Sequence, residues 1–155
     1  SIESYFVLSD VDLNTIEDFK RFANDRLPSI SNETDPIILL NKLNLLNGKH
    51  FKCAAVLLFG KEPQRFFRQS HIKIGRFISD VDIVSSDIVE GNLFRQLEQT
   101  LEILKTKYLL SPISYEGIHR REKLEYPYQA LREAILNALI HRSYQTTSAI
   151  QIRVY

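Results

Sequence analysis

The sequence predicts an α+β fold in which helices pack on a mostly antiparallel sheet. Segments whose apolar residues recur three and four positions apart, typical of amphipathic helices, are interspersed with shorter segments whose apolar residues alternate, typical of half-buried strands. Hydrophobic residues make up 44% of the 155 residues, and charged residues make up 25%. This composition is ordinary for a globular protein and supplies enough apolar side chains for a core.

Two helices are expected in the first third of the chain. The first covers 14–26, where Thr15 and Asp18 have the spacing of a capping box. The second opens at Pro36 and ends before Gly48, because proline favours the first helical position and glycine the position just past the end. The apolar residues expected to face the core are Ile16, Phe19, Phe22, Ala23, Ile38, Leu39, Leu43 and Leu46.

The middle of the chain contains a linker, an ambiguous run and two strands. The segment 27–35, rich in Pro, Ser, Asn and Thr, is the candidate linker. The apolar run 53–59 is too short for its periodicity to distinguish a buried helix from a buried strand. Strands are expected at 71–79, with a β-bulge at Gly75 where the alternation slips, and at 81–89.

Two longer helices and a strand are expected in the second half. One helix starts after Gly91 and runs to about Lys107. The segment 112–126 is expected to be extended, and Pro127 then opens a helix that runs to about Arg142. A last strand contains the alternating residues Ile150, Ile152 and Val154. The apolar stripe of the first of these helices consists of Leu93, Leu97, Leu101, Leu104 and Tyr108.

Cysteine content and the N-terminal sequence indicate a cytoplasmic protein. A single cysteine, Cys53, cannot form an internal disulfide, which fits a reducing compartment. The N-terminus lacks the basic and apolar regions of a signal peptide. No apolar run approaches the roughly 18 residues of a membrane span. The formal net charge of +1 gives no overall attraction to nucleic acid, so any contact with it must be local.

Both ends of the chain suggest a segment of a larger protein. The sequence contains no methionine, and it stops at Tyr155 within an alternating strand pattern. A strand without its neighbours exposes unpaired N–H and C=O groups, which pair readily with another chain. We therefore expect the segment either to form a homo-oligomer, as a dimer through this edge, or to have a disordered end.

The helix expected at 127–142 carries the most informative pattern. Glu133, Asn137 and His141 are four residues apart, so they lie on adjacent turns of one face. The rest of this helix is apolar almost all round. A buried line of polar groups needs partners, water or a ligand. From the spacing alone, hydrogen bonds to neighbouring loops are an alternative to a ligand site.

Two sequence motifs together resemble a family of bacterial proteins. The motifs are AAVLLFGKEP at 54–63 and LREAILNALIHRSY at 131–144, the latter preceded by Tyr126-Pro127. They resemble proteins described as transcriptional regulators or RecG-related ATP-dependent DNA helicases. In these proteins an AlbA/Schlafen-type DNA-binding domain, also called divergent AAA, precedes a GHKL-like ATPase module. The resemblance extends from about Phe19 to the end of the chain.

The resemblance implies a nucleotide site on the 127–142 helix. The first ATP-site helix of GHKL ATPases carries Glu-x-x-x-Asn, in which the Glu activates water and the Asn oxygen helps to hold Mg²⁺ near the phosphates. Glu133 matches the catalytic base. Asn137 matches the Mg²⁺ ligand, and Asn137 and His141 would contact the nucleotide. A hard cation prefers oxygen ligands, and hydrolysis needs a base near the γ-phosphate, so the chemistry is consistent with this assignment.

The resemblance also implies a division into three parts. Residues 1–34 would end a DNA-binding region and its linker, 35–125 would form a middle α+β domain, and 126–155 would begin the ATPase module. The sequence contains neither the Asp-x-Gly-x-Gly motif for adenine nor a glycine-rich phosphate lid. These 155 residues are therefore expected to bind no ATP measurably by themselves, and a Mg-ATP site would require the intact protein.

A basic stretch is the candidate DNA contact. Its cations and interleaved aromatic residues suit phosphates and bases, although a solvated loop anchored by its phenylalanines is the alternative. The five cations are Lys61, Arg65, Arg68, Lys73 and Arg76.

The leading functional hypothesis is a segment of a DNA-associated transcriptional regulator that couples DNA binding to a nucleotide-sensing module. An ATPase or helicase-like enzyme with Glu133 as base is the first alternative. A protein-interaction or dimerisation scaffold is the second. The four histidines have no paired ligand spacing, which argues against a zinc site.

Overall fold

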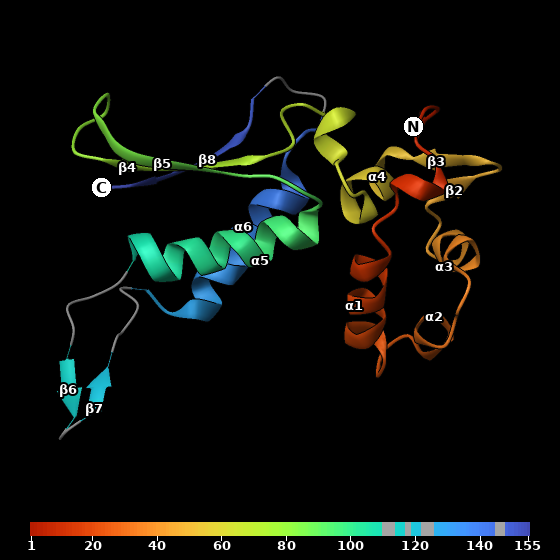
Figure 1. Cartoon of the computed structure of the whole chain (residues 1–155), viewed down its shortest axis with the longest axis horizontal. Helices are drawn as coiled ribbons and strands as arrows, with labels where there is room; N and C mark the ends of the chain where they lie inside the picture. Colours follow the sequence, from red (N-terminus) through yellow and green to blue (C-terminus); the bar gives the residue numbers. More distant parts are fainter. Residues whose placement is uncertain (110–113, 117–118, 122–125, 145–147) are drawn as a thin grey trace. The chain divides into compact units, whose positions relative to one another are not determined.

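A computed structural model describes residues 1–109, 114–116, 119–121, 126–144 and 148–155 (Figure 1). The predicted α+β class is confirmed, since short helices accompany two three-stranded sheets and a two-stranded hairpin. The chain forms two compact units, which are described separately. Unit 1 comprises Ser1–Arg68 with Gly91–Phe94, and unit 2 comprises Gln69–Glu90 with Arg95–Tyr155. No described helix is long and apolar enough to cross a membrane.

Unit 1 combines a small antiparallel sheet with short helices. The sheet has the strand order β1-β3-β2. Its strands are β1 (Ile2–Glu3), β2 (Leu46–Asn47) and β3 (His50–Lys52). The helices are α1 (Leu13–Ala23), α2 (Pro28–Ser31), α3 (Pro36–Lys42) and α4 (Cys53–Phe59), with 3₁₀ turns η1 (Leu8–Asp10) and η2 (Pro63–Arg65).

The ambiguous apolar run at 53–59 is a helix, α4, and it supplies much of the core of unit 1. Val56 and Phe59 are buried on α4, and Phe59 lies edge-on to Phe19 at 5.5 Å between ring centroids. The helix ends at Gly60, whose backbone is extended, and a Cβ there would stand 2.5 Å from the carbonyl oxygen of Val56, which accounts for the glycine. Contacts with the rest of unit 1 determine that this run is helical. Such contacts cannot be read from the periodicity of the run itself.

The N-terminus of α1 is capped by Asp12, so the predicted capping box of Thr15 and Asp18 is wrong. The Asp12 carboxylate accepts hydrogen bonds from the backbone N–H groups of Asn14 and Thr15. The Thr15 hydroxyl instead donates to Asp12 Oδ2 and accepts from the buried amide of Asn92. Asn92 also donates to the Gly60 carbonyl, so this polar cluster joins α1 to the end of α4 within unit 1.

Several further expectations for unit 1 are corrected. The second helix ends at Lys42, and Gly48 lies in the turn between β2 and β3 with φ of 60°. The segment expected to be a linker contains the short helix α2. Phe22 is 84% exposed, because it points away from the buried side of α1 that carries Ile16. Ile38 is also exposed, whereas Leu39 and Leu40 are buried.

Unit 2 contains a mixed sheet and two long helices. The strand order is β5-β4-β8, with β4 antiparallel to β5 and parallel to β8. Its strands are β4 (Ile72–Phe77), β5 (Ile83–Val89) and β8 (Ile150–Val154), and a separate hairpin is formed by β6 (Ser114–Glu116) and β7 (His119–Arg121). The helices are α5 (Leu93–Ile103), continued by a π-helical turn η3 (Leu104–Tyr108), and α6 (Tyr128–His141).

One face of the β5-β4-β8 sheet is covered and the other is open. Figure 1 shows α5 and α6 on the same side of this sheet. Ile72, Ile74 and Val89 are buried toward the helices, whereas Lys73 and Ile88, which alternate with them, are exposed. The expected bulge at Gly75 is displaced, because the register shifts between Arg76 and Phe77.

A cluster around Asp87 joins β5 to the π-helical turn. The ammonium group of Lys107 and the hydroxyl of Tyr108 both donate to Asp87 Oδ2 at 2.7 Å. The guanidinium of Arg76 donates to the Tyr108 carbonyl and lies 5.5 Å from the centroid of its ring. Two consecutive side chains reach one carboxylate here, which accounts for the local departure from α-helical geometry.

We predict that replacing Asp87 with Asn makes stability less dependent on pH in acid. The hydrogen bond from Lys107, followed by that from Tyr108, holds the pKa of Asp87 below its ordinary value. The resulting stabilisation is present above the ordinary aspartate pKa of about 4 and is lost as the pH falls through the lower pKa of the folded state. Urea unfolding at a series of pH values should show a steeper acid loss for the wild type than for Asp87→Asn.

The exposed Asp25 supplies the matched control for this experiment. Asp25→Asn removes the same charge and should leave the acid slope of the wild type unchanged. Parallel pH profiles for the wild type and Asp87→Asn would contradict the assignment.

Candidate functional site

The site is built on α6, a single uninterrupted helix from Tyr128 to His141, as predicted. Pro127 occupies the N-cap position rather than the first helical position. The helix ends because Arg142 has an extended backbone conformation with ψ of 146°. All three candidate residues, Glu133, Asn137 and His141, therefore lie on one element, and we call them the polar stripe.

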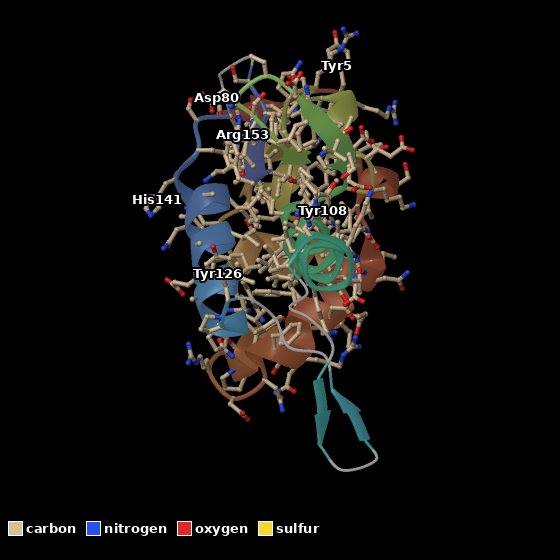
Figure 2. The ribbon with its side chains drawn as sticks, turned by 90° about the vertical axis from the view of Figure 1, so that its left-hand side faces the viewer. Tyr5, Asp80, Tyr108, Tyr126, His141 and Arg153 are labelled. Atoms are coloured by element: carbon tan, nitrogen blue, oxygen red, sulfur yellow. The ribbon has the colours of Figure 1, made fainter. Side chains whose placement is uncertain are left out.

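The polar stripe faces solvent. Glu133, Asn137 and His141 are all exposed, while Ile135 and Leu139 on the opposite side of α6 are buried. Figure 2 shows His141 near the C-terminal end of α6, on the outer side of the ribbon. Successive members of the stripe are separated by a rise of about 6 Å along the helix axis. A ligand about 12 Å long could therefore touch all three at once.

The helix is less buried than its sequence suggested. Ile140, adjacent to the stripe, is 61% exposed, and Ala134 and Ala138 are exposed as well. Within the described residues, no hydrogen bond or ion pair engages the three stripe side chains, so the alternative of bonds to neighbouring loops gains no support there. The outer face of α6 thus combines polar groups with small side chains that permit close approach.

The side chains of the stripe are of types that can contact Mg²⁺ and phosphate groups. Glu133 supplies a carboxylate and Asn137 an amide oxygen, which are ligands that Mg²⁺ accepts together with phosphate oxygens. His141 can donate a hydrogen bond to a phosphate from either ring nitrogen, depending on its tautomer. Among the described residues, no group of three or more His, Cys, Asp or Glu side chains could hold a metal ion unaided. The donor set fits one wall of such a site and needs phosphate oxygens to complete it.

Arg142, immediately after the stripe, anchors the end of α6. Its guanidinium donates to the carbonyl groups of Gln69, His71 and Ser148. Gln69 and His71 immediately precede β4, and Ser148 precedes β8. Burial lowers the pKa of Arg142, although an arginine remains charged at neutral pH. Backbone carbonyls, rather than a carboxylate, thus hold this charge.

Tyr144 completes the anchor. Its ring lies 4.9 Å from the Arg142 guanidinium, a cation–π distance, and its hydroxyl donates to the Leu139 carbonyl at 2.7 Å. Burial raises the pKa of Tyr144 to about 12. Sequence analysis assigned no role to Arg142 or Tyr144. The unpaired carbonyls at the end of a helix were a signal for Tyr144, which binds one of them, whereas no local signal indicated the distant acceptors of Arg142.

The basic residues proposed as a DNA contact do not form one patch on either unit. Lys61, Arg65 and Arg68 belong to unit 1, whereas Lys73 and Arg76 belong to unit 2. Arg65 pairs with Asp10 and Glu62 at 3.8 and 3.9 Å. Arg76 is directed toward the Tyr108 carbonyl. In unit 2 only Lys73 of this set is exposed on the open face of the sheet.

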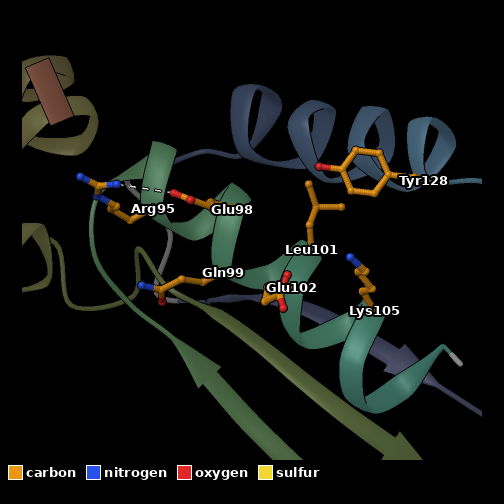
Figure 3. Close-up of a pocket in the computed structure, with 7 residues that line it drawn as sticks. All are labelled: Arg95, Glu98, Gln99, Leu101, Glu102, Lys105 and Tyr128. Atoms are coloured by element: carbon orange, nitrogen blue, oxygen red, sulfur yellow. Dashed lines mark hydrogen bonds and ion pairs between the residues drawn. The ribbon is translucent and has the colours of Figure 1, made fainter. Parts of the chain in front are cut away.

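A shallow groove of about 770 Å³ lies between α5 and the start of α6 (Figure 3). Its charges are mixed, and Arg95 pairs with Glu98 at 3.5 Å. Tyr128 lines it from the side of α6 that carries Ile135, opposite the polar stripe. The groove is therefore separate from the candidate site. The lining residues are Arg95, Glu98, Gln99, Leu101, Glu102, Lys105 and Tyr128.

A comparison with solved structures finds a similar bacterial protein. The DIP2311 protein from Corynebacterium diphtheriae is similar to this chain, with a TM-score of 0.61 and 22% sequence identity. The similarity covers 97% of this chain but only 28% of that one, so the chain spans little more than a quarter of its length. Neither a protein-family model nor a curated protein sequence matches the chain. At this identity the likeness shows a shared α+β fold.

We predict that Tyr144→Phe removes a loss of stability in alkali. An unfolded tyrosine ionises near pH 10, whereas Tyr144 in the fold ionises near 12. Between these values the unfolded state releases its proton first, so the stability of the wild type falls as the pH rises. Tyr144→Phe loses about 1 kcal/mol at neutral pH with its hydrogen bond. That deficit should shrink above pH 10 in denaturant unfolding curves.

The exposed Tyr5 supplies the control, because Tyr5→Phe should shift no part of the pH profile. A deficit for Tyr144→Phe that stays constant between about pH 9 and pH 12 would contradict the burial of this hydroxyl.

Proposed function

We propose that this chain is a segment of a DNA-associated bacterial transcriptional regulator in which the polar stripe of α6 forms one wall of a nucleotide-sensing site. The observation that carries the proposal is the alignment of Glu133, Asn137 and His141 on one solvent-facing side of an uninterrupted helix. Three polar side chains of complementary chemistry, none engaged within the described residues, are available to a ligand there.

The proposal assigns each residue a task. Asn137 directs its amide oxygen toward a Mg²⁺ ion that also binds the phosphates, and His141 donates to a phosphate oxygen. Glu133 accepts a proton from, or orients, a water molecule beside the terminal phosphate. The Glu-x-x-x-Asn spacing, shared with GHKL ATPases, supports this division of roles.

Arg142 links the site to the sheet of unit 2. It follows His141 directly and binds the carbonyls that precede β4 and β8. A ligand that draws the last turn of α6 toward itself would therefore pull on the ends of two strands. This contact supports sensing, in which nucleotide binding changes a conformation, as the leading function.

An ATPase remains the second candidate, and Glu133 distinguishes it from a sensor. A sensor needs the binding chemistry of Asn137 and His141, whereas hydrolysis needs a base at position 133 as well. The exposed position of Glu133 beside Asn137 favours neither function over the other.

We predict that the intact protein binds Mg-ATP and that residues 1–155 alone bind none measurably, because the sequence lacks a phosphate cradle. In the intact protein Asn137→Ala should weaken binding at least about tenfold, since a tenfold change corresponds to about 1.4 kcal/mol, the scale of one charge-assisted contact. Glu133→Gln should retain binding, and any hydrolysis should disappear with it. Isothermal titration and phosphate release measure these two outcomes.

Gln129→Ala, on the exposed side of the same helix one turn before Glu133, is the matched control and should change neither quantity. An intact protein that binds no Mg-ATP, or one whose affinity is indifferent to Asn137→Ala, would contradict the proposed nucleotide site.

A further inference from the structure

Within its strands, the open face of the β5-β4-β8 sheet carries two cationic side chains and no acidic one. Among the described residues, the side chains that alternate with the buried ones on this face include Lys73 from β4 and Gln151 and Arg153 from β8. Ser86 and Ile88 of β5 lie across from Gly75 and Lys73. No aspartate or glutamate occupies an outward position of these three strands, although the whole chain is almost neutral.

Two of the acids near these strands, Asp87 and Asp80, have partners, whereas the exposed Glu90 directly follows β5. Asp87 of β5 lies on the covered face, where it binds Lys107 and Tyr108. Asp80, in the turn between β4 and β5, accepts a long hydrogen bond of 3.4 Å from the Tyr155 hydroxyl. Asp80 is therefore at the margin of the open face, while Lys73 has no ion-pair partner in the described chain.

Two aromatic rings lie on the same face. Gly75 leaves room for the ring of Phe77, since a Cβ at position 75 would stand 2.7 Å from Phe77 Cε2. The guanidinium of Arg153 lies 5.0 Å from the centroid of that ring, and the ring of Tyr155 follows at 5.8 Å. These contacts hold a layer of two rings and a guanidinium against the strands, with Arg153 also donating to the Gln151 side chain.

We propose that this open sheet face binds single-stranded nucleic acid. The cations, the exposed ring of Tyr155 and the half-buried ring of Phe77 suit a nucleic-acid strand whose phosphates meet Lys73 and Arg153 and whose unpaired bases stack on the rings. A duplex keeps its bases inside the stack and cannot use the rings in this way.

The inference rests on the proposed function, because it specifies the form in which DNA is bound. It uses no residue of the polar stripe. A failure to bind Mg-ATP and a failure to bind single-stranded nucleic acid can therefore be distinguished by experiment. It also changes the sequence-based assignment, because Lys73 is retained, Arg76 is replaced by Arg153, and two aromatic residues are added.

Fluorescence anisotropy with a fluorescein-labelled dT₂₀ oligonucleotide tests the proposal on this chain. The double variant Lys73→Gln/Arg153→Gln should bind at least about tenfold more weakly at moderate salt, and its log–log salt slope should fall by about 1.4, which corresponds to two lost phosphate contacts on a single strand. The control variant Lys105→Gln/Arg132→Gln removes the same charge from exposed positions on the helices that cover the other face of the sheet, and it should stay close to wild type.

Gly75→Ala tests the aromatic layer without changing charge. The new methyl group displaces the Phe77 ring, so affinity should fall while the salt slope stays that of the wild type. Thermal unfolding checks that each variant is folded, which matters most for Gly75→Ala because position 75 is buried. The proposal is overturned if the wild type does not bind dT₂₀, if a hairpin duplex binds equally well, or if the control variant loses as much affinity as Lys73→Gln/Arg153→Gln.

Discussion

Arg142 donates to the carbonyls of Gln69, His71 and Ser148, which lie just before two adjacent parallel strands, β4 and β8. Parallel strands require a long connection, and in unit 2 that connection includes α5 and α6. One guanidinium therefore fixes the end of α6 at the point where both strands begin. Stacking on Tyr144 and the Tyr144 bond to Leu139 restrict its orientation further. The orientation of the α6 faces depends on this contact.

Because α6 is anchored at its end, its apolar side, with Ile135 and Leu139, is buried and its polar stripe is directed outward. The sheet of unit 2 is then left with one covered and one open face. The polar stripe, proposed to contact a nucleotide, and the open sheet face, proposed to bind single-stranded nucleic acid, consequently lie on different elements of the same unit. Both proposals rely on side chains that the packing of unit 2 leaves exposed.

Sequence patterns predicted the elements whose signals are local. α6 and the alternating strand β8 follow from a proline, a 3.6-residue period and a two-residue period, all of which are read within one segment. The anchor of α6 was missed because two of its three acceptors lie 71 and 73 residues away in the chain. For the same reason, the parallel pairing of β8 with β4 and the helical state of 53–59 depended on packing between distant segments. The open sheet face joins residues from β4 and β8, which no local pattern connects.

Amide hydrogen exchange on the wild type and on Arg142→Gln tests the central claim most directly, because it reports the stability of each element separately. The account predicts that the last turn of α6, the start of β4 and β8 lose protection together in the variant, while α1 and α4 of unit 1 keep theirs. Faster exchange confined to residues next to position 142, with β8 as protected as in the wild type, would contradict the claim that this guanidinium holds α6 to the two strands.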